Sequence, residues 1–184
     1  MKNIKKSTAI ILCIIMIVLS IFFGGRISLN KIRNEALSLF YEGNPDDQYD
    51  LGIEYDLERR IVFAGNLVTV AKRYTDSGNS LITAVQNACN NLSSAGDPAD
   101  KYKYNQELTT ACNNLSAYLE TQDMTDSDMR YNASVKSDME SANQIIGHSD
   151  YNNKAAEFNQ LLRKFPTNIL SKLTFVSPLK QFAY

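Results

Sequence analysis

Few residues in this chain are of the types that carry out enzymatic chemistry. His148 is the only histidine, and the carboxylate of Asp150, two residues later, would point elsewhere on a helix. There is no Gly-x-Ser-x-Gly motif, and Ile145, not Glu, stands three residues before His148, so the Glu-x-x-His pattern of metal sites in helical bundles is missing. We expect no catalytic residue and a protein that is not an enzyme. The alternative is an unrecognised enzyme that uses carboxylates inside a helical bundle, the fold that the periodicity predicts below.

The sequence also offers no recognisable set of metal ligands. Cys89, Cys112 and His148 would have to converge from three distant segments, without any Cys-x-x-Cys pair. The acidic stretch 46–50 resembles a calcium loop only superficially, because the glycine that such a loop needs comes one residue late, at Gly52. A glycine-rich phosphate loop followed by a basic residue is missing as well. We therefore expect no metal site and no cofactor.

Cys89 and Cys112 invite a test for a disulfide bond. If the intervening turn is centred near Gly96, residue 89 faces a position near residue 103, about nine residues from Cys112. That offset is about 13 Å of helical rise, whereas the Cα atoms of a disulfide lie within about 7 Å. We expect reduced cysteines in the core, although a helix that starts irregularly near Tyr104 would make the bond feasible again.

Composition and charge narrow the function classes. The chain has 184 residues, 44% of them hydrophobic, with 19 Lys and Arg against 20 Asp and Glu and no Trp. This length and composition suit one folded domain with an attachment, not a disordered polar chain. The balanced charge lacks the basic excess that a nucleic-acid backbone attracts, so we expect no nucleic-acid partner.

The N-terminal segment predicts a membrane anchor. Residues 7–25 carry no charge, and a helix of that length spans about 28 Å, close to the ~30 Å hydrocarbon core of a bilayer. A cleaved signal peptide is the alternative, but residues 22–25 form a poor cleavage site. We divide the chain into a basic N-terminus with its transmembrane anchor, residues 1–25, and a helical-bundle domain, residues 26–184. The anchor contacts membrane lipid through residues 7–25.

The charges that flank this anchor bear on its orientation. Three basic residues lie on each side of the uncharged stretch, so the positive-inside rule gives nearly a tie. The short basic segment before the stretch resembles that of a signal anchor, which leaves the N-terminus inside. We therefore expect a single-pass protein of the cell membrane with an extracytoplasmic bundle.

The rest of the chain has helical periodicity. Apolar residues recur at spacings of three and four, and the pattern predicts helices over residues 30–41, 51–74 and 98–121. Ile82, Val85, Cys89 and Leu92 form a further helical stripe between the last two. Asp97 and Pro98 are typical of an N-cap and a first helical position. A last helix of about forty residues, capped by Asp126 or Ser127, is expected to run to Phe165. The fold class is thus all-α: an N-terminal transmembrane helix followed by an elongated antiparallel bundle of four to five helices with coiled-coil-like seams.

Aromatic residues recur every seven positions near the C-terminus. Tyr151, Phe158 and Phe165 form this series, and Asn152 and Asn159 directly follow its first two members. We interpret the series as a packing seam whose Asn amides bond between segments or fix the register. A recognition groove at the end of the seam is the alternative. In the second helix, the stems of the two neighbouring arginines at 59 and 60 can cover apolar surface, and one guanidinium is expected to pair with a carboxylate of a neighbouring helix.

Two groups of these residues resemble a known family. The first group is Arg59, Arg60, Asn66, Leu67 and Val68. The second is Tyr151, Asn152, Phe158, Asn159, Phe165 and Pro166, with Phe182 near the end. With the preceding anchor, they resemble the LemA family of bacterial membrane-anchored helical proteins.

The resemblance implies a long antiparallel bundle without a general enzymatic activity, and a structural, scaffolding or signalling-accessory role at the membrane. It supplies no catalytic residues, so we interpret the two groups as structural. The expected partner is another envelope protein or a second copy of the chain. An envelope sensor, in which the bundle binds a ligand and the anchor relays the change, is the alternative.

Overall fold

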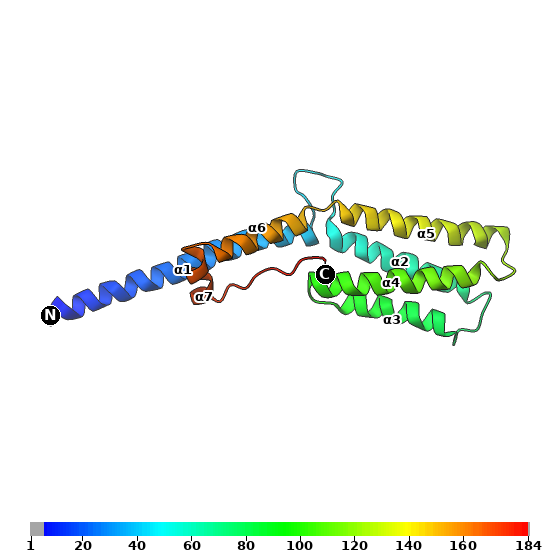
Figure 1. Ribbon diagram of the computed structural model, residues 1–184, viewed down its shortest axis with the longest axis horizontal. Helices are drawn as coiled ribbons and strands as arrows, with labels where there is room; N and C mark the ends of the chain where they lie inside the picture. The colour runs from blue at the N-terminus through cyan, green and yellow to red at the C-terminus, as the bar shows by residue number, and fades with distance from the viewer. Residues whose placement is uncertain (1–5, 184) are drawn as a thin grey trace. The chain divides into compact units, whose positions relative to one another are not determined.

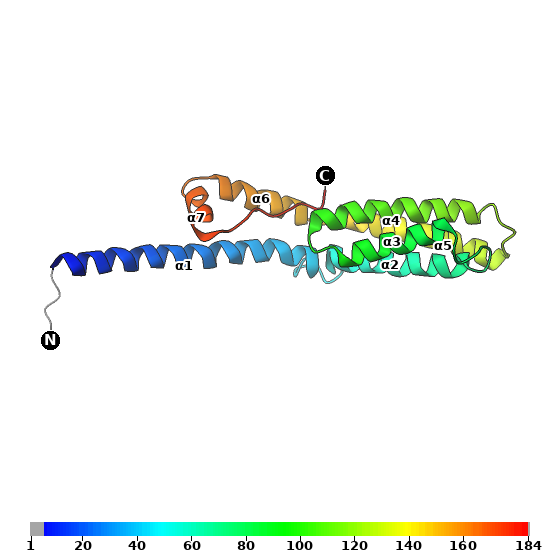
Figure 2. The ribbon, with the colours of Figure 1, turned by 90° about the horizontal axis from the view of Figure 1, so that it is seen from below.

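The computed structural model describes residues 6–183, and its regular secondary structure over that range is all helical (Figures 1 and 2). Its helices are α1 (Lys6–Tyr41), α2 (Gly52–Ala71), α3 (Ser80–Ser94), α4 (Pro98–Leu119), α5 (Asp126–Gly147), α6 (Tyr151–Arg163) and α7 (Thr167–Thr174). The described range contains no β-strand. The predicted all-α fold is confirmed.

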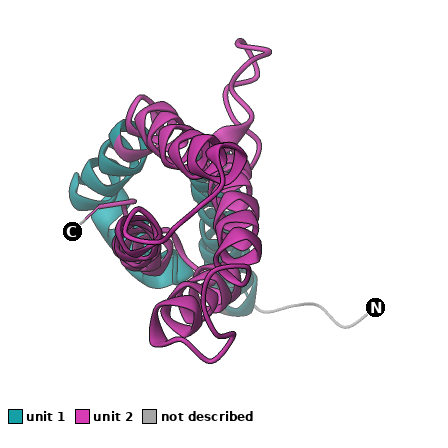
Figure 3. Ribbon diagram, turned by 90° about the vertical axis from the view of Figure 1, so that its right-hand side faces the viewer, with its two compact units in different colours: residues 1–37, 153–179 teal, residues 38–152, 180–184 magenta. Residues whose placement is uncertain are grey.

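The chain divides into two compact units, which Figure 3 distinguishes by colour. Unit 1 comprises residues 1–37 and 153–179, and unit 2 comprises residues 38–152 and 180–184. The boundaries fall within α1 and near the start of α6, so each of these two helices contributes residues to both units.

Unit 2 is built around the four helices α2 to α5, which run side by side in both views (Figures 1 and 2). α2 packs against α3 and α5, and α4 packs against the same two helices. Short connections force successive helices to run in opposite directions. The core consists of the apolar stripes that the periodicity predicts. Its most deeply buried residues are Leu57, Ala64, Leu67, Ile82, Val85, Leu92, Leu108, Leu115, Leu119 and Ala142.

The ends of α4 and α5 are fixed by capping side chains. The Asp97 carboxylate accepts hydrogen bonds from the backbone N–H groups of Ala99 and Asp100, and Pro98 is the first residue of α4, as expected. At α5, neither Asp126 nor Ser127 is the N-cap, and that prediction is wrong. Thr125 caps this helix, because its backbone is extended and its hydroxyl accepts from the backbone N–H of Asp128.

The single last helix of about forty residues is also a wrong prediction. α5 ends at Gly147, residues 148–150 are not helical, and α6 begins at Tyr151. The hydroxyl of Ser149 accepts a hydrogen bond from the backbone N–H of Tyr151, which satisfies a donor in the first turn of α6. A short polar segment thus separates the two helices, and the apolar spacing lengthens there to five residues, from Ile146 to Tyr151.

Unit 1 contains the apolar stretch of the N-terminus. α1 runs without a break from Lys6 to Tyr41, so the predicted anchor and the predicted helix over residues 30–41 form one helix. Residues 153–163 of α6 and all of α7 belong to the same unit. α7 was not predicted; it packs on α1, where its Leu170 lies beside Gly25 and its Thr174 carbonyl accepts a hydrogen bond from Arg26.

Candidate functional site

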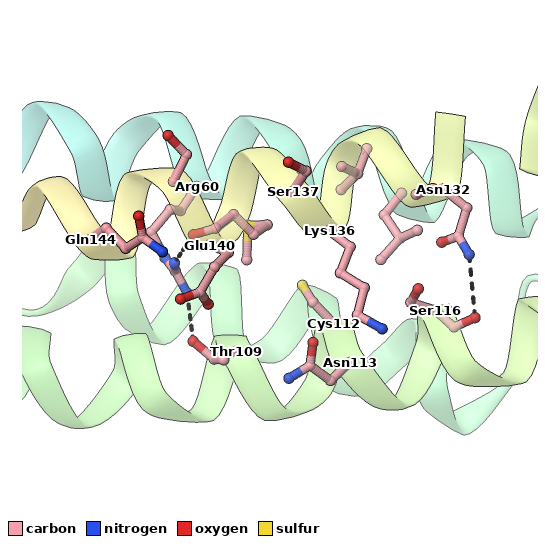
Figure 4. Close-up of a pocket in the computed structure, with 15 residues that line it drawn as sticks. Arg60, Thr109, Cys112, Asn113, Ser116, Asn132, Lys136, Ser137, Glu140 and Gln144 are labelled. Carbon is pink, nitrogen blue, oxygen red and sulfur yellow. Dashed lines mark hydrogen bonds between the residues drawn. The ribbon is translucent and has the colours of Figure 1, made fainter. Parts of the chain in front are cut away.

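The best-formed cavity in unit 2 is a polar cleft of about 540 Å³ between α2, α4 and α5 (Figure 4). Its volume lies within the range of small-molecule sites, which is about 300–1,000 Å³. Seven of its fifteen lining residues carry a hydroxyl or amide side chain. The residues that matter below are Arg60 from α2, Thr109, Cys112 and Ser116 from α4, and Asn132, Lys136, Met139 and Glu140 from α5.

Arg60 brings a positive charge into the interior at one end of this cleft. Its side chain is only 1% exposed, and the guanidinium donates to the backbone carbonyl of Met139 and to the hydroxyl of Thr109. Its Nε atom is buried and has no hydrogen-bond partner. Burial lowers the pKa of Arg60, while Cys112 and Glu140 act in the opposite direction. The group remains a cation, because arginine does not deprotonate in proteins.

Asn132 and Ser116 form the opposite end of the cleft. Asn132 is 2% exposed, and its amide nitrogen donates to the backbone carbonyl of Ser116 at 3.4 Å. The Oδ1 atom of Asn132 and the hydroxyl of Ser116 are buried without a partner. Such groups cost about 1–3 kcal/mol each when nothing satisfies them. The polar groups at the two ends of the cleft are thus one cation, one amide oxygen and one hydroxyl.

The other chemical groups of the cleft are a protonated thiol, a second cation and a carboxylate. Burial raises the pKa of Cys112 to about 12, so its sulfur is a neutral thiol near pH 7 and a poor nucleophile. Lys136 and Glu140 are exposed residues of α5 that line the cleft, and the Lys136 side chain extends toward Cys112 and Asn113 (Figure 4). Two cations against one carboxylate favour a small anionic or polar guest. This arrangement can bind and orient such a guest.

No metal site is visible in the part of the chain that the structure describes, residues 6–183. The acidic loop 46–50 uses its carboxylates locally. Asp50 accepts from the backbone N–H groups of Asn44 and Gly52, and Asp47 accepts from that of Tyr49. Cys89 and Cys112 are free thiols.

The two arginines singled out from the sequence have different surroundings. Arg59 pairs with Asp56 of its own helix at 3.3 Å and lies over the rings of Tyr55 and Phe63. Arg60 contacts a carbonyl and a hydroxyl of other helices. The expected pairing of one guanidinium with a carboxylate of a neighbouring helix is therefore not what the structure has. Of the other residues in this group, Leu67 is in the core and Asn66 is exposed.

The two Asn residues of the C-terminal group hold the backbone of the extended C-terminal segment by hydrogen bonds. Asn159 exchanges two hydrogen bonds with the backbone of Leu179, both 2.8 Å long, within unit 1. Asn152 does the same with Phe182 within unit 2, at 3.0 and 2.8 Å. In each pair the Asn amide acts as both donor and acceptor for an extended segment that has no strand partner.

The aromatic seam is only partly as expected. Tyr151 and Phe158 are buried, and Tyr151 contacts the ring of Phe40 in unit 2. Phe165 is 80% exposed, because α6 ends at Arg163 and the chain turns at Pro166. The packing seam therefore includes the first two aromatic residues and not the third.

Sequence reasoning missed the polar cleft. Its signal is present, however, because Asn132 precedes Val135 by three residues and Met139 by seven, and so occupies a core position of the α5 stripe. A polar residue in such a position needs a partner or a role.

Comparisons with known proteins give one match. The model of the LemA family matches residues 51–184, which is most of the chain. No curated protein and no solved structure matches the sequence.

Proposed function

The chain belongs to the LemA family, and we propose that it is a single-pass membrane protein whose helical bundle has a non-enzymatic scaffolding or interaction role in the cell envelope. The observation that carries this proposal is the N-terminal part of α1. The helical segment Thr8–Tyr41 is long and apolar enough to cross a membrane, and the most apolar part of it is not buried in the protein. Lipid would remove this surface from water.

Membrane insertion is tested by fractionation of the full-length protein. We expect it to remain in the membrane pellet after washing at high salt and high pH, and to be released by detergent. Placing two charges in the middle of the stretch, Ile14→Lys with Ile17→Lys, costs about 2.5–3.5 kcal/mol per residue and should shift the protein out of the membrane. Val62→Lys, at an exposed apolar position of α2, is the control and should leave the protein in the pellet. Full-length wild-type protein in the aqueous fraction would refute the proposal.

The side on which the bundle lies follows from protease treatment of intact cells. The proposal places it outside the cytoplasm, so we expect digestion of the bundle without lysis. Protection until lysis would reverse the orientation and leave the anchor in place.

The interaction role is supported by the charge of unit 2. Residues 38–152 and 180–184 contain 18 acidic and nine basic residues, a formal charge of −9. Such a surface repels nucleic acid and attracts a basic protein surface. Mild crosslinking in cells followed by affinity capture should give a complex with another envelope protein. A chain that is always recovered alone would contradict a partner, and one that crosslinks only to itself would indicate a self-assembled spacer.

A second candidate, an envelope sensor, is favoured by the polar cleft of unit 2. The buried cation of Arg60 and the unpartnered atoms of Ser116 and Asn132 lie at opposite ends of the cleft and would suit an extended carboxylate that carries hydroxyl groups along its length. Saturation at 100 times the Kd would stabilise the protein by about 2.7 kcal/mol. Thermal unfolding with gluconate tests this, with Arg60→Met as the variant that should lose the effect. Equal Tm shifts in the wild type and Arg60→Met, or no shift in either, would exclude the cleft as the sensor site.

A further inference from the structure

In unit 1, α7 exposes two of its three apolar side chains and buries two of its polar ones. Ile169 and Leu173, one turn apart, are 52% and 55% exposed, whereas Ser171 and Thr174 are buried. The two buried hydroxyls donate to carbonyl groups of α7 itself, so they need no water. A helix on a water-exposed surface has the opposite arrangement. The outward face of α7 therefore suits apolar surroundings.

The exposed apolar surface extends to both ends of this helix. Phe165 before α7 and Phe175 after it are each 80% exposed. Phe175 has a left-handed backbone, with φ 56°, which is uncommon for a bulky residue and ends the helix. We call Phe165, Ile169, Leu173 and Phe175 the α7 apolar patch. Clustered exposed apolar side chains of this kind mark contact with a membrane or a protein.

The position of α7 on α1 indicates which of these it is. A Cβ atom on Gly25 would lie 3.5 Å from the Leu170 side chain, and the Arg26 guanidinium donates to the Thr174 carbonyl at 3.3 Å. Gly25 and Arg26 are the residues at which the uncharged stretch of α1 ends. α7 is therefore packed against the point where a membrane-spanning α1 would leave the hydrocarbon core.

The charge of this region matches an anionic lipid surface. Residues 26–37 and 153–179, the part of unit 1 that follows the uncharged stretch, contain seven Lys and Arg against two Asp and Glu. Arg163 and Lys172 line one cleft of about 500 Å³, together with Phe175. Basic side chains next to apolar ones are typical of segments that lie in the membrane interface, where they meet lipid phosphates.

We infer that the α7 apolar patch is a second membrane contact, which places α7 in the interfacial layer of the bilayer beside the anchor. The four apolar side chains enter the outermost acyl region, and Arg163 and Lys172 bind the phosphates of anionic lipids. This inference rests on the proposed membrane-spanning role of α1. The contact would fix the rotation and tilt of the anchor, which a single apolar helix leaves free.

The test uses the absence of tryptophan from the sequence. Three full-length variants each carry one reporter: Leu19→Trp in the anchor, Leu173→Trp in the patch and Val62→Trp in unit 2. Val62 is 59% exposed, close to the 55% of Leu173, and is the matched control. The proteins are reconstituted into vesicles of phosphatidylcholine and phosphatidylglycerol, with and without brominated acyl chains, which quench tryptophan that touches them.

We expect brominated lipid to remove most of the fluorescence of the Leu173→Trp and Leu19→Trp variants and little of that of Val62→Trp. Chains brominated near the headgroup should quench the patch reporter at least twofold more than chains brominated near their ends. An unquenched Leu173→Trp emission, whether at the wavelength of water-exposed tryptophan or shifted to shorter wavelength by a second copy of the chain, would overturn the inference. Loss of quenching for Leu19→Trp would instead refute the anchor itself.

A charge variant separates lipid phosphate from acyl contact. In the Leu173→Trp background, Arg163→Gln with Lys172→Gln should lower quenching at least twofold in vesicles that contain phosphatidylglycerol, and much less in pure phosphatidylcholine. The pair Lys72→Gln and Lys103→Gln, two exposed lysines of unit 2, is the control and should change neither. An equal effect of the two double variants would contradict the assigned role of Arg163 and Lys172.

Discussion

The side-chain amide of Asn159 holds both backbone polar groups of Leu179. Its oxygen accepts from the Leu179 N–H and its nitrogen donates to the Leu179 carbonyl, each at 2.8 Å. An extended segment without a neighbouring strand otherwise loses these bonds to water. An amide is the only common side chain that can be donor and acceptor in this planar arrangement.

Replacing this amide by a carboxylate should loosen the segment around Leu179. In Asn159→Asp the acceptor remains, but the donor is lost and a negative oxygen faces the Leu179 carbonyl. We expect the local opening free energy to fall by about 1–3 kcal/mol, seen as faster hydrogen exchange of the Leu179 amide. Asn152→Asp is the matched control, because it should accelerate exchange at Phe182 and not at Leu179. Unchanged exchange at Leu179 would mean that Asn159 does not hold the segment.

Two glycine substitutions in unit 2 should change stability in opposite directions. Gly43 has a φ of +83°, and a Cβ there would lie 2.0 Å from the Asp50 carbonyl oxygen. Gly43→Ala should therefore lower the free energy of unfolding by about 1–3 kcal/mol or more. Gly65 is an exposed residue inside α2 with nothing within 4 Å of the added atom, so Gly65→Ala should raise it by about 0.5–1 kcal/mol. Thermal unfolding in detergent micelles ranks the stabilities of the two variants and the wild type. A Gly43→Ala variant as stable as the wild type would refute the close approach of Gly43 to the Asp50 carbonyl.

The sequence predicted the core of unit 2 well, because each apolar stripe repeats with the helical period and the cap at Asp97 is local. The sequence did not predict the features that depend on contacts between helices. α7 was not predicted because Ile169 and Leu173 face outward while Ser171 and Thr174 are buried, so no apolar stripe points to a core. The break before Tyr151 was missed although the apolar spacing lengthens there to five residues, from Ile146 to Tyr151, because apolar residues resume at the helical period directly afterwards. The cleft depends on which helices meet at Arg60 and Asn132, and spacing along the chain does not contain that information.

Acid should remove a stabilising contribution from Asp128. The hydroxyl of Tyr74 is the main cause of a lowered Asp128 pKa, and Arg73, which donates at 2.8 Å, acts in the same direction. Because the pKa in the folded protein lies below the ordinary value of 3.8, the contribution is fully present above that value. It is lost as the pH falls from that value through the lower pKa of the folded protein.

The expected result is a Tm difference between the wild type and Asp128→Asn that is clear at pH 7 and shrinks as the pH falls from 3.8 through the lower pKa of the folded protein. Tyr74→Phe removes the largest cause and keeps the carboxylate, so it should narrow the pH dependence without abolishing it. A wild-type-to-Asn difference that does not shrink as the pH is lowered from 7 to well below 3.8 would show that the Asp128 carboxylate is not stabilised in the folded state.

The most informative single substitution in the cleft is Arg60→Met. Removing the guanidinium leaves no buried hydrogen-bonding group without a partner. The Thr109 hydroxyl still donates to the Asn105 carbonyl, and the Met139 carbonyl lies within α5. The change also removes a desolvated charge and the unpartnered Nε atom, and the Met side chain fills much of the same volume. By analogy with buried ion groups replaced by apolar side chains, we expect stability to be unchanged or higher by about 1–4 kcal/mol.

Thermal unfolding without added ligand measures this, with Leu57→Ala as the control that should cost about 2–5 kcal/mol. A loss of several kcal/mol in Arg60→Met would instead make the buried cation a structural element, and the polar cleft would lose its main claim to a binding role.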